Sequence, residues 1–92
     1  MSFEWDIQKA EANFKKHGVR FSEAQAVLEE DDDAITITDD ESEPEEERFV
    51  TLGTGAKGRL LVVVYCYRRD NIRIISARLA EAHERKQFEE HR

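Results

Sequence analysis

Six arginines lie within or beside the two most strand-like stretches of this 92-residue sequence. Residues 60–67 form a long apolar run, and residues 72–77 form a shorter one. A guanidinium group presents a rigid fork of donors that fits phosphate oxygens, so arginines gathered along two neighbouring strands favour an anionic ligand. The six are Arg59, Arg68, Arg69, Arg73, Arg78 and Arg85.

The two stretches predict an antiparallel hairpin with its turn at residues 69–71. Such a hairpin brings the start of its first strand beside the end of its second strand. Arg59 and Arg78 would therefore flank one end of the hairpin, with Arg73 on one side of the return strand between them. This arrangement predicts one site with three guanidinium groups.

Glu47 and Arg48 begin the preceding strand, whose direction places them near the turn end of the hairpin. Arginines scattered over a sheet face are also common on solvated surfaces that bind nothing. Composition leaves both interpretations open: a phosphate site, or an ordinary charged surface.

Two helices are predicted before the strands. The first runs over residues 7–17, because Asp6 can cap its N-terminus and Gly18 can end it in a left-handed conformation. The face of this helix that is expected to pack carries Ile7, Ala10, Phe14 and His17.

The second helix begins with Ser22 and Gln25 as a capping box and runs to about residue 28. A last helix is expected over residues 79–92, where good helix formers dominate. Its apolar face is thin, so it packs by its first turns only or waits for a partner.

Four strands complete the expected fold, in the order α-α-β-β-β-β-α. This order predicts an α+β fold in which helices pack on one side of an antiparallel four-stranded sheet. The glycine-rich residues 53–58 lack the Lys-Ser/Thr pair of a phosphate loop and lead into a strand, so they are predicted to form an ordinary turn. The expected strands are residues 35–38, 47–53, 59–67 and 72–77.

Charge is distributed very unevenly, although the net charge is −7. Residues 29–47 contain 12 of the 21 acidic residues and no Lys or Arg. The other 9 acidic residues stand against 14 basic ones, which leaves a charge of +5 outside this acidic belt. A phosphate senses the local charge rather than the total, so the sequence predicts a basic body that carries an acidic belt.

Several classes of protein are disfavoured. Cys66 is the one cysteine and lies in an apolar run, so a buried, inert thiol is expected rather than a catalytic one. The three histidines lack metal-site spacing, and neither metal nor cofactor is expected. No apolar stretch approaches the roughly 20 residues that span a bilayer, and no secretory signal is visible. A single domain over residues 1–92, in a reducing cytoplasm, fits best.

A series of short motifs runs through nearly the whole chain: Phe3-Glu4-Trp5-Asp6, Lys9-Ala10, Asn13, Lys16-His17-Gly18-Val19, Phe21, Glu46-Glu47-Arg48-Phe49, Gly53, Gly58-Arg59-Leu60-Leu61-Val62-Val63, Ile72-Arg73-Ile74-Ile75-Ser76-Ala77-Arg78, Ala80, Glu84-Arg85 and Phe88-Glu89. In order and spacing this series resembles the BrnT family, the toxins of bacterial type II toxin–antitoxin pairs. One departure is clear. The family usually carries a His-Ser pair before Glu-Glu-Arg, whereas this chain has Ser42-Glu43-Pro44-Glu45.

The resemblance implies a RelE-like fold and a ribonuclease that blocks translation by cutting RNA. It implies a BrnA-like antitoxin with a ribbon-helix-helix region as partner, in a hetero-oligomer that binds operator DNA through the antitoxin and represses its own operon. The missing His-Ser pair and the net charge leave an alternative, a non-catalytic module that binds the antitoxin as a co-repressor.

RNA cleavage without a metal needs a base, a cation for the phosphorane and an acid for the leaving oxygen. Under the resemblance, Arg59, Arg73 and Arg78 are the candidates for the phosphate. Four residues stay open as the base. They are Glu47, Tyr65, His17 and Lys16. Further contacts with the RNA are expected from Lys9, Lys16, His17, Arg48 and Arg85.

Overall fold

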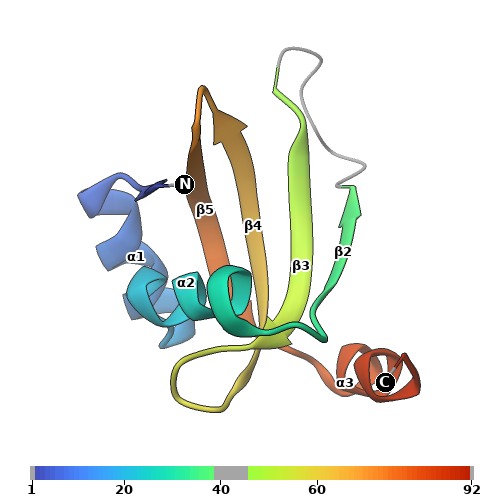
Figure 1. Ribbon diagram of the computed structural model, residues 1–92. Coiled ribbons are helices and arrows are strands. Elements are labelled where there is room, and N and C mark those ends of the chain that lie inside the picture. The colour runs from blue at the N-terminus through green and yellow to red at the C-terminus, as the bar shows by residue number, and fades with distance from the viewer. Residues whose placement is uncertain (1, 39–45, 92) are drawn as a thin grey trace.

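The computed structural model describes residues 2–38 and 46–91 of the chain. Five strands of this part form one sheet, with two helices before β2 and one helix after β5 (Figure 1). Residues 39–45, which include Pro44 and the stretch that stands in place of the family's His-Ser pair, lie outside the described residues. The elements are β1 (Ser2–Glu4), α1 (Ile7–His17), α2 (Phe21–Glu30), β2 (Ile35–Thr38), β3 (Arg48–Thr54), β4 (Leu60–Arg68), β5 (Asn71–Leu79) and α3 (Ala82–Glu90).

The strands lie in the order β1-β5-β4-β3-β2. β2 to β5 form the predicted antiparallel meander, but β1 pairs with β5 in parallel. The prediction of four antiparallel strands is therefore wrong, because the sheet has five strands of mixed orientation and the element order begins with a strand. Three residues are too few to show a periodic pattern. Phe3 pairs with Ile72 and packs against the core, which fixes this strand in place.

The other strands lie close to their predicted places. β2 is confirmed at residues 35–38, and each end of β3, β4 and β5 differs from the prediction by one or two residues. Arg69 and Asp70 form the hairpin turn, and Arg69 takes a left-handed φ of 58°. The glycine-rich segment is a turn between β3 and β4, as predicted.

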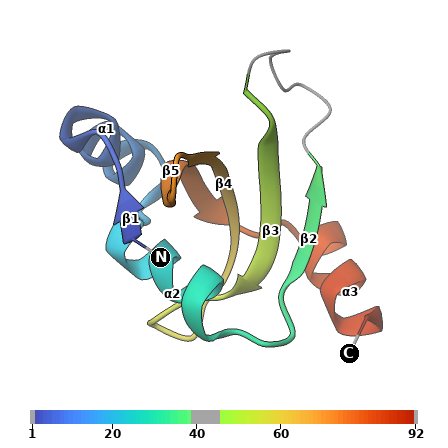
Figure 2. The same cartoon turned by 45° about the horizontal axis from the view of Figure 1, so that its top comes forward.

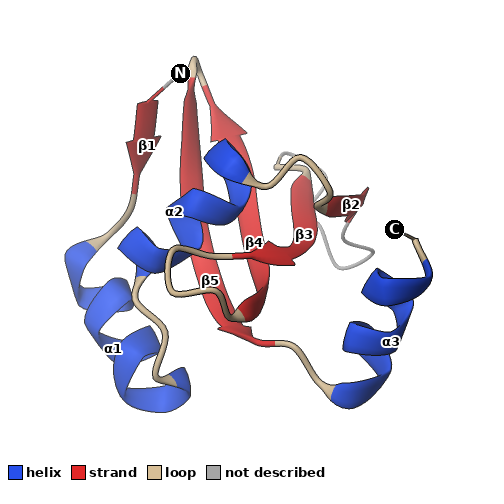
Figure 3. Cartoon of the chain, turned by 60° about the horizontal axis from the view of Figure 1, so that its bottom comes forward, coloured by secondary structure: helices blue, strands red, loops and turns tan. Residues whose placement is uncertain are grey.

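Alternate residues of β4 point to opposite faces of the sheet, and helices cover parts of both faces. Leu61 and Val63 belong to the main core, which includes residues of α2. Leu60 and Val62 belong to a smaller cluster with Phe88 of α3. α3 therefore lies across the sheet from α1 and α2 (Figures 2 and 3), and the predicted placement of all helices on one side is wrong.

The ends of α1 match the prediction, but its buried face matches it only in part. The Asp6 side chain accepts a hydrogen bond from the Lys9 backbone N–H at 3.1 Å, and Gly18 ends the helix with a φ of 71°. Ala10 packs against the main core as predicted, but Ile7 is 72% exposed and Phe14 is 37% exposed, so the predicted apolar stripe is buried only in part. The buried residue of α1 is the polar Asn13.

The other two helices differ from their predictions at their N-termini. α2 starts at Phe21, which is buried, and no side chain caps it, so the predicted capping box of Ser22 and Gln25 is wrong. In α3 a capping box does form, between Glu81 and Glu84. None of the described helices is long and apolar enough to cross a membrane.

Asn13 occupies the open edge of β5. β1 pairs with β5 only as far as Arg73, and beyond that point α1 lies beside β5. The Asn13 side-chain amide donates to the Ala77 carbonyl at 2.8 Å and accepts from the Ala77 N–H at 3.1 Å. It also donates to the Val19 carbonyl at 3.0 Å. One side chain therefore replaces a neighbouring strand and fixes α1 to the sheet.

Replacing Asn13 with Ala should lower the free energy of unfolding by about 2–4 kcal/mol, because buried backbone groups lose their partners. Denaturant unfolding measures this change. Lys15→Ala on the exposed side of α1 is the matched control and should stay within about 0.5 kcal/mol of the wild type. An Asn13→Ala protein as stable as this control would contradict the strand-edge role.

Candidate functional site

A row of side chains crosses four strands on the sheet face opposite α1 and α2. Cys66 pairs with Arg48 of β3 and Arg73 of β5, and Arg73 pairs with Glu4 of β1. The neighbouring Tyr65 packs in the main core, so Cys66 and its partners face the other way. Side chains at such paired positions have Cβ atoms about 5 Å apart. We call these four residues the arginine row.

Arg73 of the arginine row is partly exposed and forms an ion pair with Glu4. Its Nη1 lies 2.8 Å from the Glu4 carboxylate, and the two side chains are 26% and 32% exposed. Asn71 also donates to Glu4 at 3.1 Å. The hydrogen bonds from Asn71 and Arg73 lower the pKa of Glu4 below its usual value. The lowered pKa keeps the Glu4 carboxylate ionised at neutral pH, and the ion pair remains open to solvent.

The neutral thiol of Cys66 lies at the centre of the arginine row, and the carboxylate of Glu46 lies beside it. Burial, and after it the neighbouring carboxylate of Glu46, raises the pKa of Cys66. Cys66 is free and fully buried, as predicted, and its raised pKa favours the thiol over a nucleophilic thiolate. The acidic residue that the sequence predicts for the site is the adjacent Glu47 and not Glu46. Glu47 is exposed and immediately precedes β3.

Arg78 lies on the same face as the arginine row, at the other end of β5. It pairs across the strands with Val62, and its guanidinium contacts both oxygens of Glu84 at 2.7 and 2.8 Å. The hydrogen bond with Glu84 raises the pKa of Arg78, and the same contact lowers the pKa of Glu84. The contact joins β5 to α3.

A β-bulge brings Arg73 and Arg78 to one face. They are five positions apart, an odd spacing that puts residues of a regular strand on opposite faces. The pairing of β5 with β4 skips Ile75, since Ile74 pairs with Tyr65 and Ser76 pairs with Val64. The extra residue reverses the alternation.

Arg59 lies on the opposite face from Arg78. It donates from Nε and Nη2 to the two oxygens of Glu23 at 2.8 and 2.6 Å, and from Nη2 to the Gly18 carbonyl at 3.0 Å. The Glu23 side chain is 3% exposed, so this pair links the start of β4 to α2. The predicted grouping of Arg59 with Arg78 is therefore not found. A catalytic role for Arg59 stays a prediction.

Tyr65 faces the core and not the arginine row. Its hydroxyl lies 2.9 Å from the hydroxyl of Thr51, which lies 2.6 Å from the hydroxyl of Thr36. Tyr65 is 5% exposed. The role of Tyr65 as a base also stays a prediction. Its side chain lies on the opposite face of the sheet from Arg73.

The predicted RNA contacts fall into separate places. Arg48 belongs to the arginine row, whereas Arg85 lies on α3, beside a hollow that Gly58 and Leu60 also line. A depression of about 340 Å³ brings the basic residues of α1 together along β5. It is lined by Lys9, Ala12, Asn13, Lys16, His17, Ile75 and Ser76.

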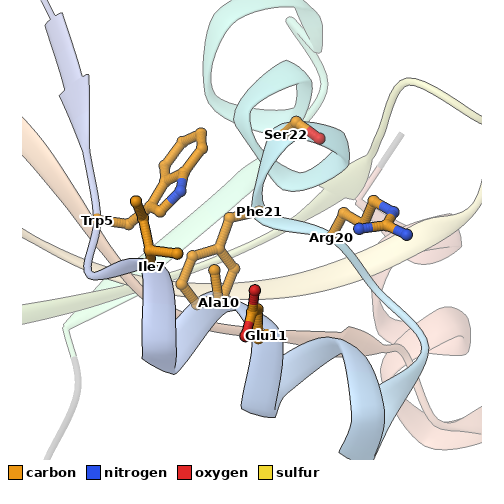
Figure 4. Close-up of a pocket in the computed structure, with 7 residues that line it drawn as sticks. All are labelled: Trp5, Ile7, Ala10, Glu11, Arg20, Phe21 and Ser22. Carbon is orange, nitrogen blue, oxygen red and sulfur yellow. The ribbon is translucent and has the colours of Figure 1, made fainter.

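Two further hollows lie near β1. The first, of about 150 Å³, is mostly apolar and lies between α1 and α2, with the rings of Trp5, which follows β1, and Phe21 against it (Figure 4). The second, of about 440 Å³, is polar and lies at the tip of the β4–β5 hairpin. Its lining is Glu4, Arg68, Arg69 and Asn71.

Sequence reasoning missed Glu4 and Glu46 as members of this region. Both residues belong to the motifs that carry the family resemblance, and this position in the motifs could have identified them as candidate site residues. Among residues 2–38 and 46–91, no three His, Cys, Asp or Glu side chains gather closely enough to hold a metal ion.

Comparison with family models matches residues 5–84 to the ribonuclease toxin BrnT of type II toxin–antitoxin systems. The fold is similar to the crystal structure of the Brucella abortus ribonuclease toxin BrnT, with a TM-score of 0.67 and 23% identity. That match covers 88% of this chain and 97% of the other, and at this identity it shows the shared fold. Comparison with curated proteins gives no match.

Arg59→Ala should destabilise the protein, because it leaves the carboxylate of Glu23 buried without its cation. Adding Glu23→Ala should restore part of the lost free energy of unfolding, which a double-mutant cycle measures. Lys57→Ala, an exposed change in the neighbouring turn, is the control. Equal stability of Arg59→Ala and Lys57→Ala would contradict the structural role of the pair.

Glu84 should make folding sensitive to acid. Its pKa is lower in the folded state than in the unfolded chain, so its contribution is complete above the unfolded value of about 4.3 and is lost as pH falls through the folded value. The stability difference between the wild type and Glu84→Gln should therefore shrink below about pH 4. Denaturant unfolding at a series of pH values measures it. A difference that stays constant to about pH 2 would rule out the lowered pKa.

Proposed function

Because the chain belongs to the BrnT family of ribonuclease toxins of type II toxin–antitoxin systems, we propose that it is an endoribonuclease that needs no metal and inhibits translation by cutting RNA. The arginine row is the observation that carries this proposal. It places two guanidinium groups and a carboxylate on one sheet face, which is the charge pattern that phosphate transfer requires.

The scissile phosphate would lie between Arg48 and Arg73. Both residues flank Cys66, and their guanidinium groups can stabilise the negative charge that grows on the phosphorane. Arg78 lies on the same face roughly 13 Å further along β5, because its partner Val62 is four residues from Cys66, the partner of Arg73, at about 3.3 Å per residue. An RNA strand that follows β5 would meet both Arg73 and Arg78.

Glu46 is the residue that we assign as the base. Its carboxylate lies beside Cys66, the residue that pairs with both Arg48 and Arg73. It would take the proton of the ribose 2′-hydroxyl, whose oxygen attacks the phosphorus while the bond to the 5′ oxygen breaks. The 5′ oxygen takes up a proton from water, so the products carry a 2′,3′-cyclic phosphate and a 5′-hydroxyl. Glu47 is the nearest alternative among the predicted bases.

The remaining predicted residues would act outside the chemical step. Arg59 would hold α2 against β4 through its contact with the buried Glu23. The depression lined by Lys9, Lys16 and His17 would contact more distant phosphates of a long RNA.

Membership of a type II family implies an antitoxin partner. We propose that this partner is a BrnA-like ribbon-helix-helix protein, and that the two proteins form a hetero-oligomer in the bacterial cytoplasm. The antitoxin would contact operator DNA, and the complex would repress its own operon.

One observation favours a second candidate, a co-repressor without ribonuclease activity. Arg59, Arg73 and Arg78 each already contact a carboxylate of the chain itself. In this alternative the arginines serve folding alone. The purified protein would then leave RNA intact and still bind its antitoxin.

Arg73→Ala should reduce the rate of RNA cleavage by about 10²–10³-fold, the usual effect of removing a donor that stabilises transition-state charge. A fluorogenic RNA in the presence of EDTA gives the rate. Glu4→Ala is the matched control, because it breaks the same ion pair but keeps the guanidinium, and it should retain most of the activity. Equal losses in both variants would assign the pair to folding and contradict the proposed site.

A further inference from the structure

Tyr67 presents an unusual exposed aromatic ring at the tip of the β4–β5 hairpin. It is 50% exposed, although it belongs to a central strand. The rings of Phe49 and Tyr65 meet it edge-on, at centroid distances of 5.5 and 6.1 Å and angles of 78° and 76°. Two neighbours therefore fix the orientation of the ring while half of its surface stays open to solvent.

The supporting rings are themselves held firmly. Phe49 stacks on Tyr65 at 5.8 Å and 27°, and the Tyr65 hydroxyl bonds to Thr51 in the core. Thr51 is 2% exposed and bonds onward to Thr36. Tyr67 is thus preorganised, so a flat ligand that covers it costs little side-chain entropy.

Arg68 and Arg69 lie at the same tip, with Asp70 in the same turn and Glu4 lining the same hollow. Arg68 follows Tyr67 and points to the opposite face, where it lines the polar hollow of about 440 Å³ together with Arg69 and Asn71. Arg68 of β4 pairs with Asn71 of β5. The next pair of residues on the same face of the sheet is Cys66 with Arg73, which belongs to the arginine row. Tyr67 itself lies on the other face of the sheet, next to the core residue Tyr65. An RNA strand that leaves the arginine row toward the tip would pass this hollow and turn over the end of the hairpin to reach the ring of Tyr67.

We propose that Tyr67 is a stacking platform for one base of a single-stranded RNA whose phosphates bind the arginine row. The proposal rests on the proposed function and adds a base contact to it. Single-stranded RNA is held by aromatic rings that stack on its bases next to cations that bind its backbone. Every base has a flat face, so the contact would favour unpaired RNA over paired RNA without selecting a sequence.

The test compares two oligonucleotides of 2′-O-methyl RNA, which cannot be cut because the attacking hydroxyl is blocked. One carries all bases, and the other has the same number of phosphates but is abasic over its central nucleotides. Fluorescence anisotropy gives the affinity of each. The wild type should bind the base-bearing strand about 5–150-fold more tightly, the fold-change for one stacked base at about 1–3 kcal/mol.

Tyr67→Ala should abolish this preference, Tyr67→Phe should keep it, and affinity for the abasic strand should stay unchanged in both variants. Leu79→Ala is the control, because Leu79 is 45% exposed and lies at the other end of the same hairpin. Arg73→Ala should lower the affinity for the base-bearing strand and for the abasic strand by the same factor.

Other results would overturn the proposal in distinguishable ways. Equal binding of both strands by the wild type would refute the platform and leave phosphate binding in place. Binding of neither strand would refute the proposed function together with it. A Tyr67→Ala variant that keeps the preference but no longer binds the antitoxin would assign the ring to the protein interface instead.

Discussion

The hydrogen bonds between Asn13 and the backbone of Ala77 determine how the rest of this molecule is arranged. They satisfy a strand edge that β1 does not reach and hold α1 against β5. With α1 and α2 on one face, the opposite face of the sheet is left to α3 at one end and to the arginine row at the other. The position of α1 and α2 therefore leaves the arginine row on the face of the sheet that these two helices do not cover.

The arginines differ in how tightly the chain's own carboxylates hold them. Glu23 is 3% exposed, so moving Arg59 toward a phosphate would strand a buried negative charge. Glu4 is 32% exposed, so water can solvate it when Arg73 turns to an anion. Burial of the carboxylate, and not the presence of an ion pair, therefore separates an arginine that is fixed in the fold from one that could turn toward an anion, as the proposed RNA site requires.

Interactions between residues close in sequence predicted much of the fold. The differences between the prediction and the structure come from contacts between residues far apart in the sequence. The caps of α1 and the β4–β5 turn depend on neighbouring residues, and both were predicted correctly. The buried face of α1 was predicted only in part, because apolar periodicity cannot show that a strand edge needs the amide of Asn13. Which arginines come together depends on the face of the sheet to which each side chain points. Arg59 and Arg78 were predicted together but lie on opposite faces, and only the bulge at Ile75 brings Arg73 and Arg78 to one face.

Analysis of the RNA ends produced by the purified protein in EDTA tests the central claim most directly. Cleavage by the 2′-hydroxyl, with Glu46 as base and the arginine row on the phosphate, predicts fragments that end in a 2′,3′-cyclic phosphate and begin with a 5′-hydroxyl. Mass spectrometry of the fragments distinguishes these ends. Intact RNA, or fragments that begin with a 5′-phosphate, would contradict the account.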